Sequence, residues 1–174
     1  IDLDEEMLEM ASQKILKQRS RLKVKALDML QIENEFGANS FDMVSCFGNT
    51  LVHLSGNIQI QNFFSQLRSV LRNEGKFLLQ IINYDRIIDQ NITGLPTIEN
   101  DKIKFERYYE YISAENIIYF KTILHVKENN FKIENKIRLY PLRKAELERS
   151  LKKAGFKQLH FFGSFQGEVF TEDS

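Results

Sequence analysis

Residues 1–11 read IDLDEEMLEMA, and this stretch carries the strongest signal for the fold. Ile1–Leu3 predicts the end of a strand, and Asp4 is placed to cap a helix whose apolar residues recur at helical spacing. An acidic residue at the end of a parallel strand lies at the carboxyl edge of the sheet, where such folds bind ligands. These carboxylates can either accept hydrogen bonds from the hydroxyls of a ribose or cap the helix. We predict the ribose role for Asp2 and the capping role for Asp4.

The segments that follow continue an alternation of strands and helices. Leu22–Leu27 alternates as a short strand, and Phe41–Phe47 is an apolar run of buried-strand length. Apolar residues at helical spacing predict a helix over Ile58–Leu71, and KFLLQII at residues 76–82 predicts the next strand. The order strand, helix, strand, strand, helix, strand indicates a doubly wound, Rossmann-like α/β fold.

The pattern then changes to long runs rich in aromatic and β-branched residues. Lys102–Ile112, Asn116–Val126 and Phe131–Tyr140 follow one another with short polar connections, which predicts an antiparallel β-meander. A helix over Arg143–Ala154 comes next, and a strand is expected over Phe156–Phe162, with a last short one beginning at Val169 and Phe170. We therefore expect one domain over residues 1–174, with an antiparallel insertion at about 85–140.

Composition limits the function classes. The 174 residues contain 24 basic and 24 acidic side chains, so no strong field draws the chain to nucleic acid or to anionic lipid. No apolar run approaches the roughly 20 residues of a membrane span. The single cysteine, Cys46, rules out an internal disulfide and fits a reducing, cytoplasmic compartment. We expect a small-molecule partner, no membrane, and nucleic acid only as an unlikely partner. The chain opens with Ile1, which suggests that a segment precedes it.

A second acidic residue ends the short strand over Leu22–Leu27. Asp28 is followed by the apolar Met29, so the carboxylate can accept a hydrogen bond from an adenine amine while Met29 packs against the ring. The alternative role for Asp28 is to start a loop. The pattern by itself does not choose between the two.

Residues 41–54, FDMVSCFGNTLVHL, form the third signal. Gly48 lets the backbone approach a ligand closely where the strand ends, and Asn49 and His53 supply polar groups beside it. A cysteine near a histidine also suggests nucleophilic catalysis. Cys46 lies inside the apolar run, however, and we interpret it as a small core residue.

The order of these segments resembles class I S-adenosylmethionine-dependent methyltransferases, particularly the glycine N-methyltransferase-like group. IDLDEEML resembles the stretch whose acid holds the ribose of the cofactor, with Asp4 in place of the usual serine. The family's stretch on its fourth strand is matched by Phe41, Asp42, Val44, Asn49, His53 and Leu54. LRNEGKFLLQ lacks the family's proline, and LYPLRKAELERSLKKAGF resembles the family's last helix. The resemblance implies S-adenosylmethionine as cofactor, held by Asp2, Leu3, Met7, Asp28, Met29, Phe47, Gly48 and His53.

The family's glycine-rich loop and first strand are not in this chain and would lie upstream of Ile1. The resemblance implies the strand order 3-2-1-4-5-7-6, so the missing strand is the central one. Its absence would leave two sheet edges with unpaired backbone groups. We therefore hypothesise that the sequence is a fragment, which would bind cofactor poorly or not at all.

Methyl transfer from a sulfonium is an in-line displacement that depends on positioning and on exclusion of water. A neutral amine needs no dedicated base, and we name no catalytic residue. The region after the predicted strand over residues 76–82, including Asn83 and Arg86, lies on the substrate side. Our candidates for substrate binding are Asn49, Tyr84, Arg138 and Tyr140. For Arg138, an outward-facing position on a strand without a role in substrate binding is an equally favoured interpretation.

Other residues of the predicted meander have structural interpretations. His125 lies in an apolar run and is interpreted as structural. Phe105, Tyr108, Tyr109 and Tyr111 form an aromatic stripe that resembles a stacking surface, but packing over a core or a dimer contact is the favoured interpretation. The meander is a candidate for homodimerisation or for a lid.

Two alternatives belong to other classes. An NAD-dependent Rossmann enzyme also places an acid after its second strand. A methyltransferase-like interaction module without activity is the second. The three histidines, His53, His125 and His160, are far apart in sequence, so we predict no metal site.

Overall fold

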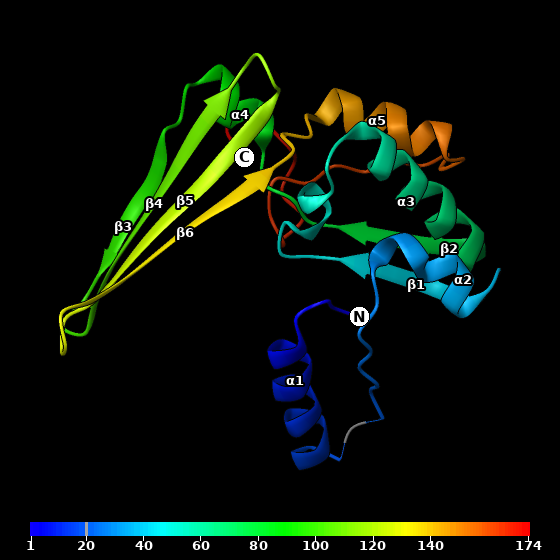
Figure 1. Ribbon diagram of the computed structural model, residues 1–174. Helices are drawn as coiled ribbons and strands as arrows, with labels where there is room; N and C mark the ends of the chain where they lie inside the picture. Colours follow the sequence, from blue (N-terminus) through cyan, green and yellow to red (C-terminus); the bar gives the residue numbers. More distant parts are fainter. Residues whose placement is uncertain (20) are drawn as a thin grey trace. The chain divides into compact units, whose positions relative to one another are not determined.

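The computed structural model describes residues 1–19 and 21–174, which divide into two compact units. The first unit comprises Ile1–Ser45 and Ile58–Leu78, and the second comprises Cys46–Asn57 and Leu79–Ser174 (Figure 1). No described helix is long and apolar enough to cross a bilayer.

The first unit begins with a parallel bridge between Asp2 and Ala26. Helix α1, Glu5–Lys17, follows, and Asp4 caps it by accepting a hydrogen bond from the Met7 amide at 3.0 Å, as predicted. The strand predicted over Leu22–Leu27 is wrong beyond that bridge. Leu22 is 71% exposed, so this segment has little apolar packing to hold it extended against a partner.

Two short helices follow that the sequence patterns did not predict. A 3-10 turn covers Met29–Gln31, and α2 covers Ile32–Phe36. Gly37, with φ 71°, ends α2 in a backbone conformation that glycine adopts without strain. Five residues are too few to show a helical period.

A parallel pair of strands forms the sheet of the first unit. Figure 1 shows β1, Phe41–Cys46, and β2, Leu71–Leu79, running in the same direction. Helix α3, Asn57–Val70, packs on β2, with the rings of Phe64 and Phe77 6.1 Å apart. The buried side of α3 comprises Ile60, Phe63, Phe64, Leu67 and Val70, which confirms the helical spacing predicted there.

Strand boundaries and burial differ from expectation. β2 begins at Leu71 rather than at Lys76 and ends at Leu79 rather than at Ile82. The Arg68 guanidinium, at the end of α3, donates to the carbonyls of Leu71 and Arg72 at 3.2 and 3.3 Å. β1 is not a fully buried strand, and Met43 is 54% exposed. Among the described residues, β2 is its one sheet partner, and no strand pairs with both β1 and the Asp2–Ala26 bridge.

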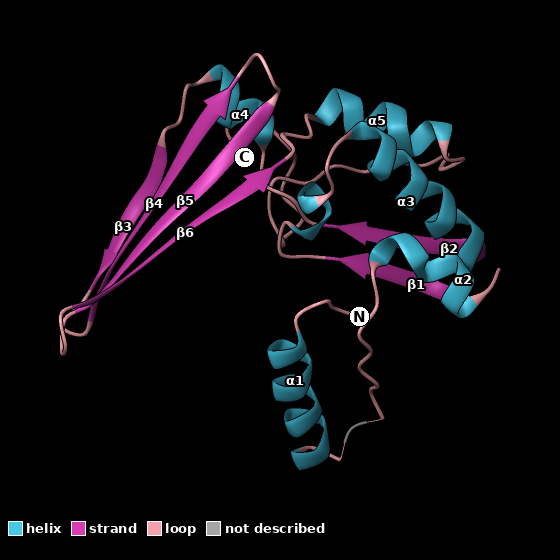
Figure 2. Ribbon diagram, viewed as in Figure 1, coloured by secondary structure: helices cyan, strands magenta, loops and turns pink. Residues whose placement is uncertain are grey.

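The second unit contains the antiparallel meander. It consists of β3, Gly94–Glu99, β4, Ile103–Ile112, β5, Ile117–Val126, and β6, Phe131–Leu139, paired in that order (Figure 2). The three predicted strands are confirmed as β4 to β6. β3 was not predicted, since Pro96 and a register shift between Leu95 and Ile98 interrupt its alternation.

The meander has two chemically different faces. One face, the charged face, carries ion pairs such as Lys121–Glu110 at 2.7 Å and Lys127–Glu99 at 2.8 Å. On the opposite face the register aligns Tyr109, Phe120 and Ile137 across three strands. This apolar face lines the cavities described below.

Helices flank the meander in sequence. A 3-10 turn covers Thr50–His53, α4 covers Tyr84–Asp89 and α5 covers Lys144–Lys153. The predicted last helix is thus confirmed as α5. Helix α4 was not predicted, because six residues are too few to show a helical period. The strand predicted over Phe156–Phe162 is wrong: only an isolated bridge between Phe162 and Val169 forms, with no neighbouring strand in the described residues to extend it.

Candidate functional site

A cavity of about 260 Å³ opens inside the second unit, and we call it the Asn49 cavity. Its walls come from the loop after β1, the residue Ile82 after β2, and the apolar face of the meander. The lining residues are Gly48, Asn49, His53, Ile82, Phe120, Ile137 and Leu139. Three of the residues selected from the sequence, Gly48, Asn49 and His53, therefore lie on one cavity.

Two consecutive left-handed residues shape the loop after β1. Gly48 has φ 73° and Asn49 has φ 64°, a conformation that glycine and asparagine tolerate best. The Gly48 amide donates to Oε1 of Gln80 at 2.7 Å, and the Gln80 amide donates to the Cys46 carbonyl at 2.9 Å. These bonds tie the loop to the segment that follows β2.

The Asn49 side chain connects that loop to α4. Its Oδ1 accepts from the Ile82 amide at 3.1 Å, and its Nδ2 donates to the Tyr84 hydroxyl at 2.9 Å. Tyr84 is 1% exposed, and burial raises the pKa of its hydroxyl well above the ordinary value. Both residues were predicted to bind substrate, and the structure joins them in a hydrogen-bonded pair.

Arg138 and Tyr140 do not line the Asn49 cavity. Arg138 extends from the charged face and donates to the Ser55 carbonyl at 3.3 Å from both terminal nitrogens. The Tyr140 hydroxyl donates to Oε1 of Glu146 at 2.6 Å. Burial raises the pKa of the Tyr140 hydroxyl, and the hydrogen bond to the Glu146 carboxylate raises it further. Their role in binding an acceptor stays a prediction.

In the region after β2, the predicted residue Asn83 has hydrogen-bond partners within the protein. Asn83 caps α4 by accepting from the Arg86 amide at 3.2 Å, and its Nδ2 donates to the carbonyls of Glu172 and Ser174. Arg86 is exposed.

The first unit holds the acidic candidates for cofactor binding. Oδ1 of Asp2 accepts from the amides of Leu3 and Asp4 at 2.7 and 3.0 Å, and the side chain is exposed. Asp28 starts the 3-10 turn, accepting from the Leu30 amide at 2.8 Å. Its loop-initiating role is therefore present, and an adenine role stays a prediction.

Apolar candidates for the cofactor differ in exposure. In the first unit, Leu3 is 69% and Met7 57% exposed, while Met29 is partly buried. In the second unit, Phe47 is 48% exposed, and its ring lies 6.1 Å from that of Phe165. Phe165 was not selected from the sequence, and an isolated phenylalanine in a polar segment gives no signal.

Cys46 does not have the environment of a nucleophile. It is partly buried, and desolvation raises the pKa of its thiol despite a hydrogen bond with the Leu51 backbone. The thiol is therefore neutral at ordinary pH, and a neutral thiol is a poor nucleophile.

The aromatic stripe divides between packing and exposure. Tyr109 is 6% exposed and its ring lies 5.2 Å from that of Phe120, in agreement with packing. Tyr108 and Tyr111 remain 42% and 38% exposed. His125 lies on the charged face, with Nε2 3.6 Å from a carboxylate oxygen of Glu106.

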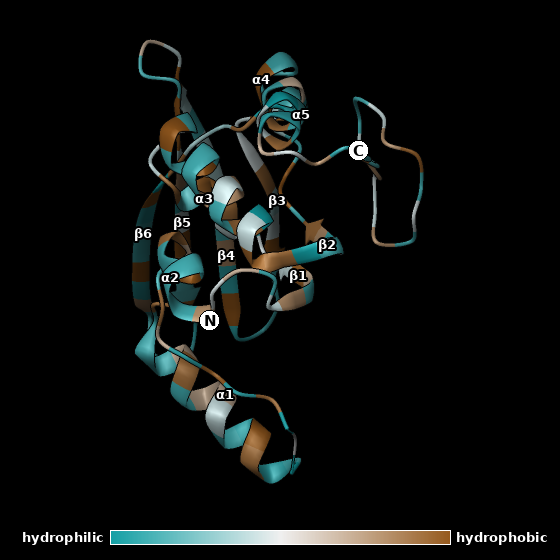
Figure 3. Cartoon of the chain, turned by 90° about the vertical axis from the view of Figure 1, so that its right-hand side faces the viewer, coloured by the Kyte–Doolittle hydropathy of each residue, from teal (hydrophilic) through white to brown (hydrophobic). Residues whose placement is uncertain are grey.

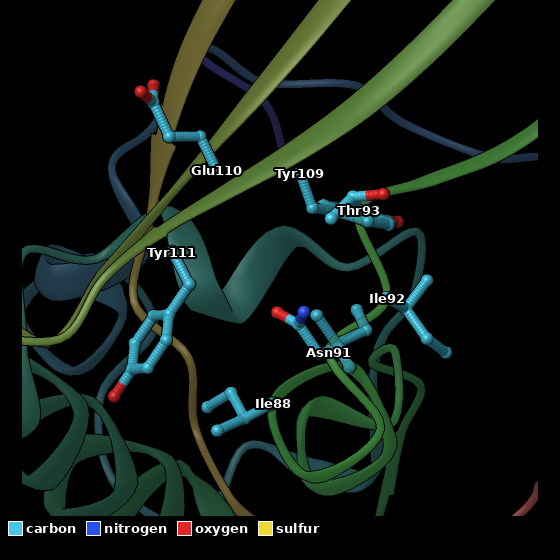
Figure 4. A pocket seen from close by; sticks show the side chains of 8 residues that line it. Ile88, Asn91, Ile92, Thr93, Tyr109, Glu110 and Tyr111 are labelled. Carbon is cyan, nitrogen blue, oxygen red and sulfur yellow. The ribbon is translucent and has the colours of Figure 1, made fainter.

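A second cavity, of about 330 Å³, lies between α4 and β4, and we call it the Tyr109 cavity (Figure 4). It is lined by Ile87, Ile88, Asn91, Ile92, Thr93, Tyr109, Glu110 and Tyr111. Tyr109 packs on Phe120, which lines the Asn49 cavity, so this ring pair lies between the two cavities. No motif in the sequence pointed to this second cavity.

Comparisons with known proteins agree with this architecture. Residues 1–75 match a family model described as a methyltransferase domain. The glycine/sarcosine/dimethylglycine N-methyltransferase of Actinopolyspora halophila is 28% identical over 141 residues, covering 76% of this chain and 22% of that protein. The glycine/sarcosine N-methyltransferase of Aphanothece halophytica is 28% identical over 138 residues, covering 76% of this chain and 48% of that protein.

A solved structure shows the same fold. An S-adenosylmethionine-dependent methyltransferase from Clostridium acetobutylicum superimposes with a TM-score of 0.82 at 15% identity, covering 98% of this chain and 68% of that one. The chain therefore shares the fold of that S-adenosylmethionine-dependent methyltransferase, and its first 75 residues match the methyltransferase-domain model, in agreement with the resemblance found in the sequence. The two sequence relatives are themselves glycine/sarcosine N-methyltransferases by name. The chain spans about half the length, or less, of these two relatives.

Proposed function

We propose that the protein transfers a methyl group from S-adenosylmethionine to a nitrogen of a small-molecule acceptor bound in the Asn49 cavity. The observation that carries this proposal is the convergence of Gly48, Asn49 and His53 on one cavity. These residues belong to the stretch that resembles the methyltransferase family. The relatives' names support a small amine as acceptor.

The residues proposed to hold the cofactor fit its polar groups. Only Oδ1 of Asp2 is engaged among the described residues, so Oδ2 is available for a ribose hydroxyl. Gly48 carries no side chain where β1 ends, and a Cβ at this position would meet only Thr50 Oγ1, at 4.0 Å, so the space beside its backbone is open. When bound, S-adenosylmethionine supplies an electrophilic methyl group.

The chain's own residues then orient the acceptor and exclude water. The apolar wall of Phe120, Ile137 and Leu139 removes solvent from one side of the cavity, while Asn49 is held rigid by its two hydrogen bonds. Positioning of this kind accelerates an in-line displacement without a dedicated base. We propose no catalytic acid, base or nucleophile.

The proposal also covers the domain organisation, the cellular compartment and the partners of the protein. We propose that the meander β3 to β6 is an insertion in a methyltransferase domain and that the reaction takes place in the cytoplasm, where the lone Cys46 stays reduced. The balanced charge of the chain supports a small-molecule partner rather than nucleic acid. A homodimer through the meander stays a hypothesis.

Calorimetric titration tests the cofactor assignment. S-adenosylmethionine and, separately, NADH are titrated into this chain and into the longest natural chain that contains it. We expect the longest natural chain to bind S-adenosylmethionine, and Asp2→Asn to weaken that binding at least about tenfold, since a hydrogen bond to a charged group is lost. The amide oxygen of Asn can still accept from Leu3 and Asp4, so the local turn is preserved.

Asp4→Ser is the matched control, because serine retains the helix cap while removing an adjacent charge. It should leave the affinity for S-adenosylmethionine within about twofold. Binding of NADH alone would favour the NAD-dependent alternative. Binding of neither nucleotide by the folded natural chain would favour the interaction module without activity.

A further inference from the structure

Apolar side chains form most of the wall of the Asn49 cavity. Phe120, Ile137 and Leu139 lie on the apolar face of the meander, and Ile82 adds a fourth apolar side chain after β2. Leu139 is buried, while the other three are half-buried. Among the described residues that line this cavity, none carries a guanidinium, an ammonium group or a carboxylate.

Three arginines of the second unit have partners away from this wall. Arg107 lies on the apolar face of the meander but donates to the Pro96 carbonyl at 2.8 Å. Arg138 donates from the charged face to the Ser55 carbonyl, and Arg143 forms ion pairs with two acidic residues of α4. The described wall therefore presents an apolar surface that no guanidinium interrupts.

Such a wall treats a carboxylate and an alkyl group in opposite ways. An ionised carboxylate that leaves water for an apolar cavity needs a cation or several donors in exchange. Nδ2 of Asn49, the nearest amide donor, already donates to the Tyr84 hydroxyl at 2.9 Å. Each methylene transferred from water to an apolar wall, by contrast, strengthens binding about threefold to fourfold. The wall therefore favours an alkyl group over a carboxylate.

Asn49 supplies a polar contact that an amine can use. Its Oδ1 accepts from the Ile82 amide at 3.1 Å, and a carbonyl oxygen has a second lone pair for another donor. The bonds to Ile82 and Tyr84 hold the side-chain amide in one orientation. An amine that donates an N–H to this oxygen keeps the lone pair of its nitrogen free for the methyl group.

We propose that the acceptor is an amine whose amine-bearing carbon carries a short alkyl group, and not a carboxylate, packed against Ile82, Phe120 and Ile137. The cavity of about 260 Å³ and the ring pair of Phe120 and Tyr109, 5.2 Å apart at its edge, keep this group short. The inference rests on the proposed function, whose acceptor class it specifies. Glycine and sarcosine, which the relatives are named for, each carry a carboxylate, so the inference separates this protein from them in specificity.

The kinetic experiment compares isobutylamine with glycine in the longest natural chain that contains this one. The two molecules have the same arrangement of heavy atoms, with an isopropyl group in place of the carboxylate. Only neutral amines react, so rates are compared at about pH 9.5, near the pKa of about 10.4 of an alkylamine. We expect kcat/KM for isobutylamine to exceed that for glycine at least about tenfold. Equal or better use of glycine overturns the inference and leaves the proposed methyl transfer standing.

Ile137→Arg tests whether this wall sets the preference. A guanidinium at this half-buried position should lower the ratio of kcat/KM for isobutylamine to kcat/KM for glycine at least about tenfold, because it repels alkyl groups and attracts carboxylates. Asn135→Arg is the matched control, since Asn135 lies two residues earlier on the same strand and face, is exposed and does not line the cavity. It should leave the ratio within about twofold. Equal changes in both folded variants would contradict the assignment to this wall.

A binding measurement on the unaltered natural chain needs no variant and no methyl transfer. Isobutanol and glycolate repeat the same isosteric pair without an amine, and the methyl signals of Ile137 and Leu139 are followed by NMR during each titration. We expect isobutanol to shift these signals saturably and glycolate to bind at least about tenfold more weakly. This result supports the inference even where no methyl transfer is detected. Tighter binding of glycolate, or no shift with either molecule, overturns it.

Discussion

At the scale of single residues, α3 concentrates the buried aromatic packing of the first unit. Phe64 is fully buried, and its ring contacts both Phe63 and Phe77. Phe64→Ala should lower the free energy of unfolding by about 3–5 kcal/mol, because it removes buried apolar area and leaves a cavity. Urea denaturation followed by circular dichroism measures this change.

Ile58→Ala is the control on the same helix. Ile58 is 88% exposed, so its truncation should change the free energy of unfolding by no more than about 0.5 kcal/mol. Equal losses in the two variants would contradict the assignment of the buried side of α3.

Residue identity predicted some site features and missed others. The Asp4 cap and the grouping of Gly48, Asn49 and His53 could be predicted, since each depends on local spacing. The Tyr109 hydroxyl and Nε of Arg107, two buried atoms without a hydrogen-bond partner among the described residues, could not be recognised from the sequence. Their lack of partners depends on strand register and on α4, neither of which is encoded in a local motif.

At the scale of elements, long periodic segments were the most predictable. α3, α5 and strands β4 to β6 each present nine or more residues with one period. Short elements such as α2 and α4 offer too few residues for a period to be visible. The segments over residues 22–27 and 156–162 have strand-like composition, but a strand also needs a neighbour, and composition does not supply one.

The connection between α4 and α5 gives an element-scale prediction. Nε of Arg143 donates to Asp85 at 2.7 Å and a terminal nitrogen donates to Asp89 at 2.6 Å. Asp85 raises the pKa of Arg143, which therefore stays charged. Arg143→Ala should lower the free energy of unfolding by about 1 kcal/mol, a modest value because the pair is partly exposed. Arg149→Ala, at an exposed position of α5, should have a smaller effect in the same urea titration.

The charged face of the meander should make stability depend on pH. Hydrogen bonds from Lys127, Lys104, Lys121 and Lys132 respectively lower the pKa of Glu99, Glu106, Glu110 and Glu134. A carboxyl whose pKa is lower in the folded state stabilises the fold above its unfolded pKa of about 4.3 and loses that contribution as pH falls. Thermal unfolding should therefore occur at lower temperature at pH 3.5 than at pH 7, with a smaller difference at high salt. An unchanged unfolding temperature would contradict this role of the lysines.

At the scale of the whole molecule, burial is distributed unevenly along the chain. Helix α1, all of whose residues are described, buries none of them, and Figure 3 shows apolar positions distributed among polar ones on this helix. The Asp2–Ala26 bridge joins a residue that precedes α1 to a residue that follows it. By contrast, α3 buries five residues. Local opening should therefore cost much less free energy in α1 than in α3.

Native-state hydrogen exchange tests this difference and connects it to cofactor binding. We expect the amides of α1 to exchange by local opening at least about a hundredfold faster than those of α3, since each 1.4 kcal/mol corresponds to a factor of ten. In the longest natural chain that contains this one, S-adenosylmethionine should slow exchange at Leu3, Asp4 and the first turn of α1, because a ribose on Asp2 fixes the turn that those two amides form. Asp2→Asn should remove that protection without changing exchange in α3. Equal exchange in α1 and α3 without ligand would show instead that α1 is held by packing as strong as that of the core.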